Sequence, residues 1–172
     1  SGFFSEGAVG ANVVPSQSSA VADDSGNTLS ISAGSLDSGS YAIVVVETIK
    51  LTDLAAPPPA QTSGSTSGTF RFGSSAIQIS FFDGGDLSGT ADKITLNRPA
   101  RVCMTYTQAD LDGAYGGPDG VKIWHYNGTA WVSLSTTLFT NPNRVCAYTS
   151  SFSPFALGLA VAPPDAGTAA ST

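Results

Sequence analysis

The sequence predicts an all-β fold: an antiparallel β-sandwich with Greek-key-like order and extended N- and C-terminal segments. Short apolar runs, many of them alternating or β-branched, are separated by turns rich in Gly, Pro and Asp. No segment shows the apolar period of a helix of ordinary length. A chain of 172 residues, of which 41% are hydrophobic, is long enough to bury the core of one such domain.

In the first half of the chain, the strongest strand signal is the β-branched run at 41–51. Glu47 interrupts its apolar side, so we expect a bulge or an exposed end there. A Pro-, Ser- and Gly-rich loop at 55–68 follows. Strands are expected, in chain order, at residues 8–14, 27–33, 41–51, 69–72 and 76–81.

The second half of the chain is organised around a predicted hairpin whose turn is Asn127-Gly128, because both residues tolerate positive φ. Large side chains occupy both faces of residues 121–126, which predicts a central strand. The stretch 110–120 is predicted to be an acidic, Gly-rich loop. Further strands are expected at residues 101–106, 131–134, 144–148 and 155–161.

These elements predict one sandwich domain at residues 27–161, between an N-terminal extended segment at 1–26 and a small-residue tail at 162–172. The N-terminal segment is expected to be an edge strand of this domain or a contact between subunits. Because the chain begins with Ser and has no signal-peptide pattern, we expect a processed or excised piece. The candidate residues for self-association are Phe3, Phe4, Val9, Val13 and Val14.

The two cysteines, Cys103 and Cys146, each occupy the third position of an Arg-Val-Cys strand. If these strands are neighbours, a disulfide between them is geometrically possible. It would stabilise the fold by about 4 kcal/mol on the chain-entropy estimate. Two buried free thiols are the alternative, and the secreted-type composition favours the disulfide.

Charged residues make up only 12% of the chain, so its surface is expected to consist of small neutral polar groups, as in secreted and cell-surface proteins. The net charge is −6, and the seven basic residues are scattered singly. Nucleic acid is therefore excluded as a partner, because phosphate binding needs clustered Lys and Arg. No run is long and apolar enough for direct membrane insertion. The predicted location is extracellular, at a cell surface.

No catalytic constellation is found, so the chain is predicted not to be an enzyme. His125 lies near no nucleophile motif and is interpreted as a structural strand residue. No cofactor is expected. The acids mostly flank Gly in turns, where Asp is favoured locally, although calcium is an alternative ligand for such loops. The calcium candidates are Asp83, Asp86, Asp110, Asp112 and Asp119.

The aromatic residues of the hairpin suggest a second possible site. Trp124, Tyr126 and Trp131 are candidates for a platform that stacks on sugar rings, although such residues also pack in cores or across hairpins. Asn127-Gly-Thr129 matches the glycosylation acceptor pattern, but the hairpin turn fully explains these residues.

The chain order from residue 27 to 157 includes a Pro-rich loop, the segment Ile94–Tyr106, the Trp-bearing hairpin and a closing Ser151–Leu157. In this order the chain resembles the ZU-five β-sandwich of ankyrins and netrin receptors, in the divergent form of prokaryotic surface proteins. The resemblance implies a noncatalytic interaction and scaffold module. One branch of that family cleaves itself within a His-Phe-Ser tripeptide. Here the matching residues are Ser151-Phe152-Ser153, followed by Pro154, so self-cleavage is not expected.

Together these features predict a noncatalytic, extracellular structural module of a cell surface that self-associates, as in a filament or surface layer. Its partners would be copies of itself or other surface proteins. The alternative is a carbohydrate-binding or adhesive module of a larger surface protein.

Overall fold

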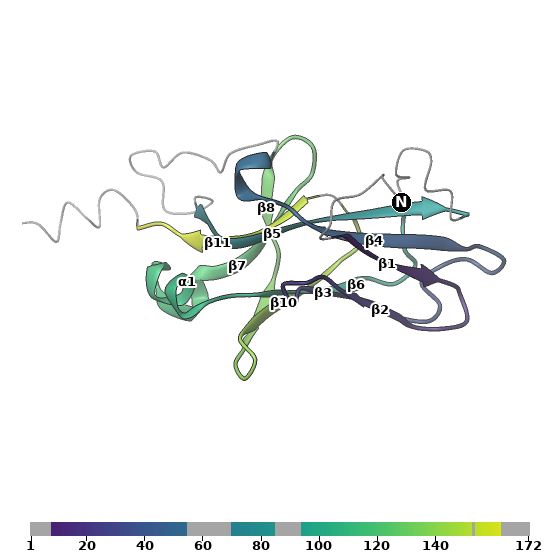
Figure 1. Cartoon of the computed structure of the whole chain (residues 1–172), viewed down its shortest axis with the longest axis horizontal. Helices are drawn as coiled ribbons and strands as arrows, with labels where there is room; N and C mark the ends of the chain where they lie inside the picture. Colours follow the sequence, from purple (N-terminus) through teal and green to yellow (C-terminus); the bar gives the residue numbers. More distant parts are fainter. Residues whose placement is uncertain (1–7, 55–69, 85–93, 153, 163–172) are drawn as a thin grey trace, which may run out of the picture.

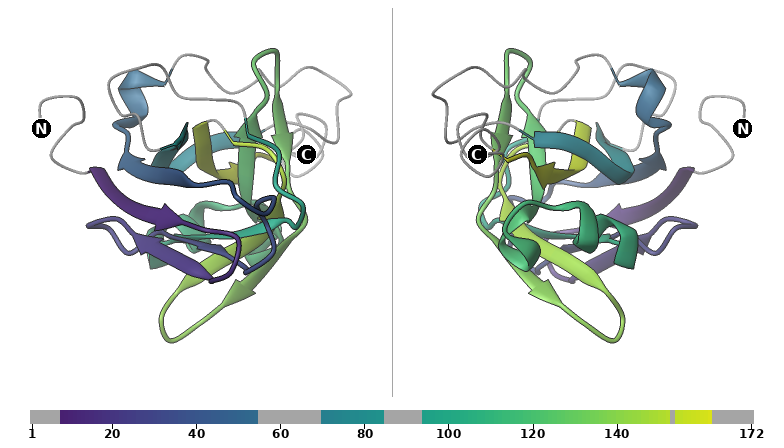
Figure 2. Two further views of the ribbon diagram at one scale, coloured as in Figure 1. Left: turned by 90° about the vertical axis from the view of Figure 1, so that its right-hand side faces the viewer. Right: turned by 90° about the vertical axis from the view of Figure 1, so that its left-hand side faces the viewer.

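The computed structural model describes residues 8–54, 70–84, 94–152 and 154–162, and within them two antiparallel sheets pack face to face (Figures 1 and 2). Sheet A has the strand order β1-β4-β5-β11-β7-β8, and sheet B has the order β2-β3-β6-β10-β9. The chain crosses between the two layers repeatedly, in a Greek-key-like order. The predicted all-β sandwich is thereby confirmed.

The elements have the following bounds. Sheet A consists of β1 (Ala8–Val13), β4 (Ala42–Thr48), β5 (Phe70–Asp83), β7 (Val121–Tyr126), β8 (Trp131–Ser133) and β11 (Pro154–Ala160). Sheet B consists of β2 (Ser19–Ala22), β3 (Thr28–Ile31), β6 (Ala100–Thr105), β9 (Thr136–Phe139) and β10 (Arg144–Thr149). The short helices are η1 (Leu51–Asp53), α1 (Gln108–Gly113) and η2 (Gly117–Gly120).

The core lies between the sheets and follows from the two-residue period of each strand. Sheet A buries alternate side chains such as Val44, Ile79 and Phe155. Leu29 and Met104 of sheet B belong to the same buried cluster. These residues are almost fully removed from water. Burial of this apolar surface is the main term that holds the two layers together.

Two strand predictions need correction. The strands expected at 69–72 and 76–81 form the single strand β5, which runs through Gly73-Ser-Ser although these residues carry no apolar side chain. Its pairing with β11 shifts register there, as at a β-bulge, because residues 73–75 lie opposite Leu157 alone. The long strand expected at 41–51 ends at Thr48 and is followed by η1. The short strands β2 and β9 were not predicted, because small or polar residues dominate them.

The predicted acidic loop also contains a helix. Thr107 and Asp110 form a capping box: the Thr107 side chain accepts from the backbone N–H of Asp110, and the Asp110 carboxylate accepts from the backbone N–H of Thr107. This reciprocal pair starts α1, which lies at one end of the sandwich in Figure 2. The Thr-x-x-Asp pattern that marks the start of this helix is present in the sequence. The helix itself has six residues, which is too short to show a helical period of apolar residues.

The N-terminal segment takes part in the sandwich. β1 is an edge strand of sheet A and pairs antiparallel with β4, whereas β2 is an edge strand of sheet B. Both edges lie on the same side of the molecule (Figure 2). Residues 1–7, the loop at 55–69 and the tail at 163–172 lie outside the described residues. Among the described residues no helix is long and apolar enough to cross a membrane.

Candidate functional site

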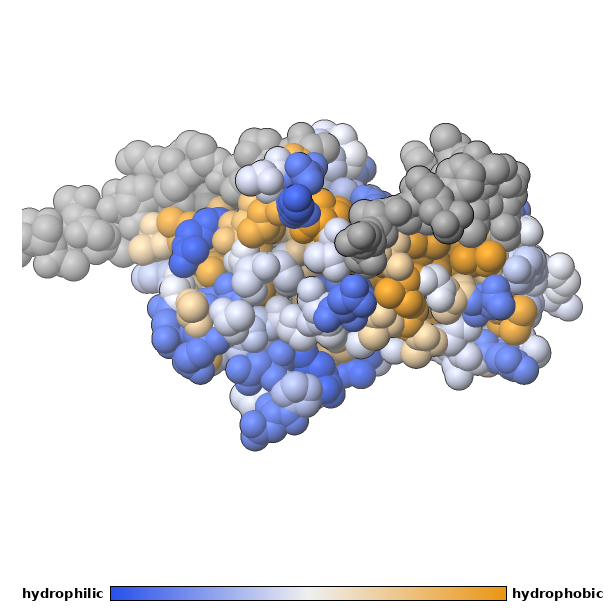
Figure 3. All heavy atoms as spheres, viewed as in Figure 1, coloured by the Kyte–Doolittle hydropathy of each residue, from blue (hydrophilic) through white to orange (hydrophobic). Residues whose placement is uncertain are grey.

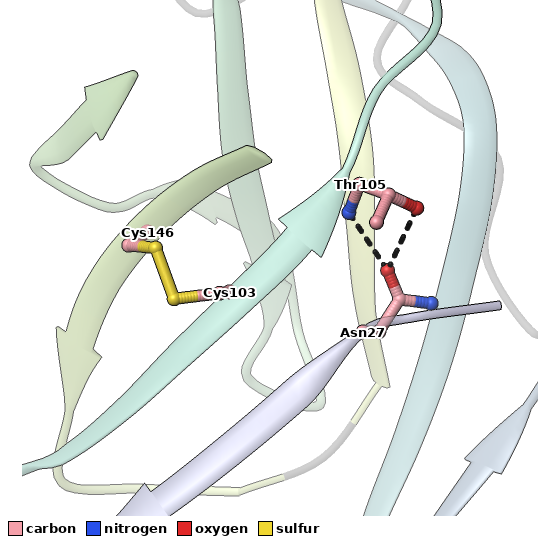
Figure 4. The surroundings of a disulfide bond; sticks show 4 residues. All are labelled: Asn27, Cys103, Thr105 and Cys146. Atoms are coloured by element: carbon pink, nitrogen blue, oxygen red, sulfur yellow. Dashed lines mark hydrogen bonds between the residues drawn. A yellow bond between two sulfur atoms is a disulfide. The ribbon is translucent and has the colours of Figure 1, made fainter. Parts of the chain in front are cut away.

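The disulfide joins the centres of two neighbouring strands of sheet B. Cys103 on β6 lies directly opposite Cys146 on β10, with the two Cα atoms 4.0 Å apart and an S–S distance of 2.10 Å (Figure 4). The predicted bond is confirmed. Such bonds persist in oxidising compartments, which is typical of a protein that folds outside the reducing cytosol.

The register of sheet B places four outward side chains in one row beside this bond. Ala20 pairs with Ser30, Ser30 with Arg101, and Arg101 with Tyr148. Because each strand contributes one residue, the row crosses β2, β3, β6 and β10. Arg101 and Tyr148 are each two residues from one cysteine, so the disulfide fixes their relative position.

A hollow of about 500 Å³ lies along this row. Its lining includes Arg101, Tyr148 and the four serines Ser18, Ser19, Ser30 and Ser32. Tyr148 is 67% exposed, more than any other large hydrophobic residue in the described part of the chain. We call this feature the sheet-B hollow. Sequence reasoning missed it, although the shared parity of Arg101 and Tyr148 with the paired cysteines was a usable signal.

Two arginines approach one aromatic ring on the same face. The guanidinium carbon of Arg101 lies 5.5 Å from the ring centroid of Phe139, and that of Arg144 lies 5.0 Å from it. Within the described part of the chain neither guanidinium forms an ion pair with a carboxylate. Cation–π attraction therefore holds both side chains over β9 and β10 while their N–H donors remain available.

A buried polar group ties sheet B to sheet A near the same strands. Asn27 is fully buried, and its side-chain oxygen accepts from the backbone N–H of Thr105 at 2.9 Å (Figure 4). Asp23 accepts from the Asn27 side chain at 2.9 Å and from the hydroxyl of Thr48, on β4, at 2.8 Å. These bonds satisfy the buried polar atoms and brace the two layers. Their role is structural.

The predicted sugar platform does not form an open surface. Trp124 is only 8% exposed and stacks on Phe70, with ring centroids 4.1 Å apart. Trp131 is half-buried and meets the edge of Phe70 at 6.0 Å and Tyr126 at 5.4 Å. The rings pack against one another on the outer face of sheet A, so Trp124 is unavailable to a sugar ring.

The calcium candidates are not brought together. Asp110 is buried and caps α1, and Asp112 accepts from the Gln108 amide at 2.8 Å. Asp83 lies at the end of β5 and Asp119 on η2, whereas Asp86 lies outside the described residues. Among the described residues no group of three or more His, Cys, Asp or Glu side chains is placed to hold a metal.

The candidate self-association residues divide into three kinds. Val13 is 1% exposed, so its side chain is unavailable to a second copy, which corrects the prediction for that residue. Val9 is half-buried and packs in part against the same inter-sheet core. Val14 is half-buried after β1. Phe3 and Phe4 lie outside the described residues.

His125 faces the core side of β7 and packs on Phe155, with ring centroids 4.7 Å apart. Burial lowers the pKa of the imidazole below its ordinary value, because the interior disfavours the charged form. This agrees with the expected structural role. In the tripeptide 151–153, Phe152 packs on Phe81 at 4.7 Å, and Ser153 lies outside the described residues.

Compared with known proteins, the chain matches no protein-family model, no curated protein and no solved structure. The resemblance to ZU-five domains therefore stays a prediction, as does the absence of enzymatic activity.

Proposed function

We propose that this chain is a noncatalytic structural module of a cell surface that self-associates by strand addition at β1. The observation that carries the proposal is an edge of sheet A at which β1 pairs only with β4 among the described strands. β1 is a six-residue edge strand, Ala8–Val13, without a charged residue or a proline. Natural sheets usually protect such an edge with Lys, Pro or a bulge. The disulfide and the weakly charged surface support a location outside the cell.

The direction of the backbone groups on β1 defines which residues would receive a partner strand. The carbonyl of Asn12 accepts from the Ser19 hydroxyl at 2.7 Å, so it points away from β4. Because alternate residues of a strand direct their N–H and C=O groups to the same edge, those of Ala8 and Gly10 also point to the open side. Gly10 is solvent-exposed.

The opposite edge of sheet A offers a matching position. β8 (Trp131–Ser133) pairs only with β7 among the described strands, and its Val132 is 45% exposed. Pairing of β1 with β8 of a second copy would continue sheet A from molecule to molecule. A head-to-tail contact of this kind builds a filament when the rotation between copies does not close a ring.

The test is negative-stain electron microscopy with light scattering on the purified chain. We expect regular filaments for the original chain and monomers for Gly10→Pro. Proline removes the N–H that points to the open edge and leaves the bonds to β4 intact, as edge strands tolerate.

The matched control is Gly10→Ala, which keeps the N–H. A Cβ at this position would make ordinary contacts, 3.5 Å from the Val44 carbonyl oxygen and 3.7 Å from Val45. This variant should assemble like the original chain. A monodisperse monomer of the original chain at high concentration would refute self-association, and filaments of Gly10→Pro would refute the role of β1.

A further inference from the structure

We propose that the sheet-B hollow binds an acidic saccharide, with Arg101 holding the sugar carboxylate and Tyr148 stacking on the sugar ring. This site is separate from β1, on the outer face of the other sheet. The inference therefore goes beyond self-association, and either proposal can fail alone.

The guanidinium of Arg101 is a candidate ligand for the carboxylate. The chain has thirteen acidic and seven basic residues, so an arginine that forms no ion pair with a carboxylate of the described residues is unusual here. Arg101 is half-buried and lines the hollow, and its guanidinium carbon lies 5.5 Å from the ring centroid of Phe139. A planar guanidinium that retains its N–H donors suits bidentate binding of a carboxylate.

Tyr148 provides an exposed aromatic ring next to Arg101. Tyr148 pairs directly with Arg101 across β6 and β10 and is 67% exposed. An aromatic ring that protrudes from a sheet offers a flat apolar face and a polar hydroxyl tip. The C–H face of a pyranose ring is apolar and can stack on it, while the carboxylate lies over Arg101.

Serine residues make up much of the remaining lining of the hollow. Exposed hydroxyl groups of Ser18, Ser30 and Ser32 surround the row. Each hydroxyl donates one hydrogen bond and accepts others, as sugar hydroxyls require. The volume of about 500 Å³ lies within the usual range of ligand pockets. Charge, stacking and hydroxyls thus converge in one place.

The disulfide preorganises the two strands that carry Arg101 and Tyr148. The bond between Cys103 and Cys146 lies in the neighbouring row of the same face. It holds the backbones of β6 and β10 in register, so the strand positions that carry Arg101 and Tyr148 need no rearrangement when a ligand binds. A backbone already in its bound arrangement lowers the entropy lost on binding.

The experiment is ligand-observed saturation-transfer NMR with digalacturonate, and with neutral galactobiose as the uncharged counterpart. We expect binding of digalacturonate in preference to galactobiose. Arg101→Gln should weaken digalacturonate binding about tenfold, as for the loss of one charged hydrogen-bonded pair, and abolish the preference. Tyr148→Ala should weaken binding of both sugars.

Two matched controls keep the test specific. Arg144→Gln removes the other guanidinium on Phe139, which does not line the hollow, and should retain the preference for digalacturonate. Tyr115→Ala removes another exposed tyrosine, 51% exposed, away from the hollow and should leave binding unchanged. If Arg101→Gln unfolds, Arg101→Lys keeps the charge without the fork and should still bind more weakly.

Other outcomes would overturn the proposal. Absence of saturation transfer to digalacturonate at millimolar concentration would remove the saccharide site. Equal binding by the original chain and Arg101→Gln would remove the role of the guanidinium. Stronger binding of a short poly-glutamate peptide than of digalacturonate would show that the face receives an acidic protein segment instead.

Discussion

The outer faces of the two sheets are stabilised in different ways. On sheet A the outward residues Phe70 and Trp124 are buried and stack over Gly158. On sheet B the outward positions carry a disulfide, the exposed Tyr148 and two arginines that form no ion pair with the described carboxylates. In Figure 3 apolar surface gathers along the sheet-A layer, whereas the sheet-B side is mostly pale or blue.

The difference indicates that a disulfide can constrain the outer face of one sheet where buried aromatic rings stabilise the outer face of the other. The aromatic cluster of sheet A stabilises by excluding water, which leaves the buried rings of Phe70 and Trp124 unavailable to ligands. The bond between Cys103 and Cys146 constrains sheet B without covering it, so adjacent residues such as Arg101 and Tyr148 stay accessible. The outer face of sheet A therefore contributes stability, whereas that of sheet B keeps side chains accessible to a ligand. Substitutions on the two faces should accordingly differ in their effect on the free energy of unfolding.

The largest expected effect is removal of the disulfide. The double variant Cys103→Ala, Cys146→Ala should lower the free energy of unfolding by about 4 kcal/mol, because the unfolded chain regains the freedom of a 43-residue separation. Urea unfolding measures it. The near-UV circular dichroism of the Trp124 cluster should change little below the transition.

Dithiothreitol provides the control for this prediction. It should destabilise the original chain by a similar amount and leave the double variant unaffected. Equal stability of the oxidised chain and the double variant would mean that packing alone holds β6 to β10.

A smaller effect is expected from Gly158→Ala on sheet A. A Cβ at this position would lie 2.7 Å from Cδ2 of Phe70 and closer still to the indole of Trp124. The stacked rings must move apart, which should lower the free energy of unfolding by about 3 kcal/mol, as for overpacked cores. Tryptophan fluorescence during urea unfolding would report both the displacement and the loss.

Gly10→Ala on the edge of the same sheet is the comparison, since its Cβ makes only ordinary contacts. It should unfold like the original chain. If Gly158→Ala were equally harmless, the aromatic cluster would be loosely packed, and the contrast between the two faces would disappear.

The sequence predicted those features that depend on local pattern. Alternation located the core strands, the Asn-Gly turn located the hairpin of β7 and β8, and the two Arg-Val-Cys strands located the disulfide. Features that depend on register were missed. The row of Ser30, Arg101 and Tyr148 exists only because three strands from distant parts of the chain align. Likewise, Trp124 was a candidate for the sugar platform because alternation does not reveal what packs on the outer face.

The smallest expected effect concerns pH and sharpens the comparison at two adjacent residues of β7. Trp124 points to the outer face, whereas His125 points to the core and packs on Phe155. Burial lowers the pKa of His125 in the folded state below that in the unfolded state. The unfolded chain therefore binds more protons between the two pKa values, and the stability of the fold decreases as the pH falls through that interval.

His125 is the only histidine in the chain, so the variant His125→Phe isolates this contribution. The stability of the original chain should be fully retained above pH 6.5, the ordinary histidine pKa, and should decrease as the pH falls toward and through the lowered value. The variant should show a flatter dependence over the same interval, because phenylalanine keeps the ring contact with Phe155 and does not titrate. Urea unfolding at a series of pH values measures both curves. Parallel curves would mean that the imidazole is as well solvated in the folded protein as in the unfolded chain, which would place it near the surface of the sandwich.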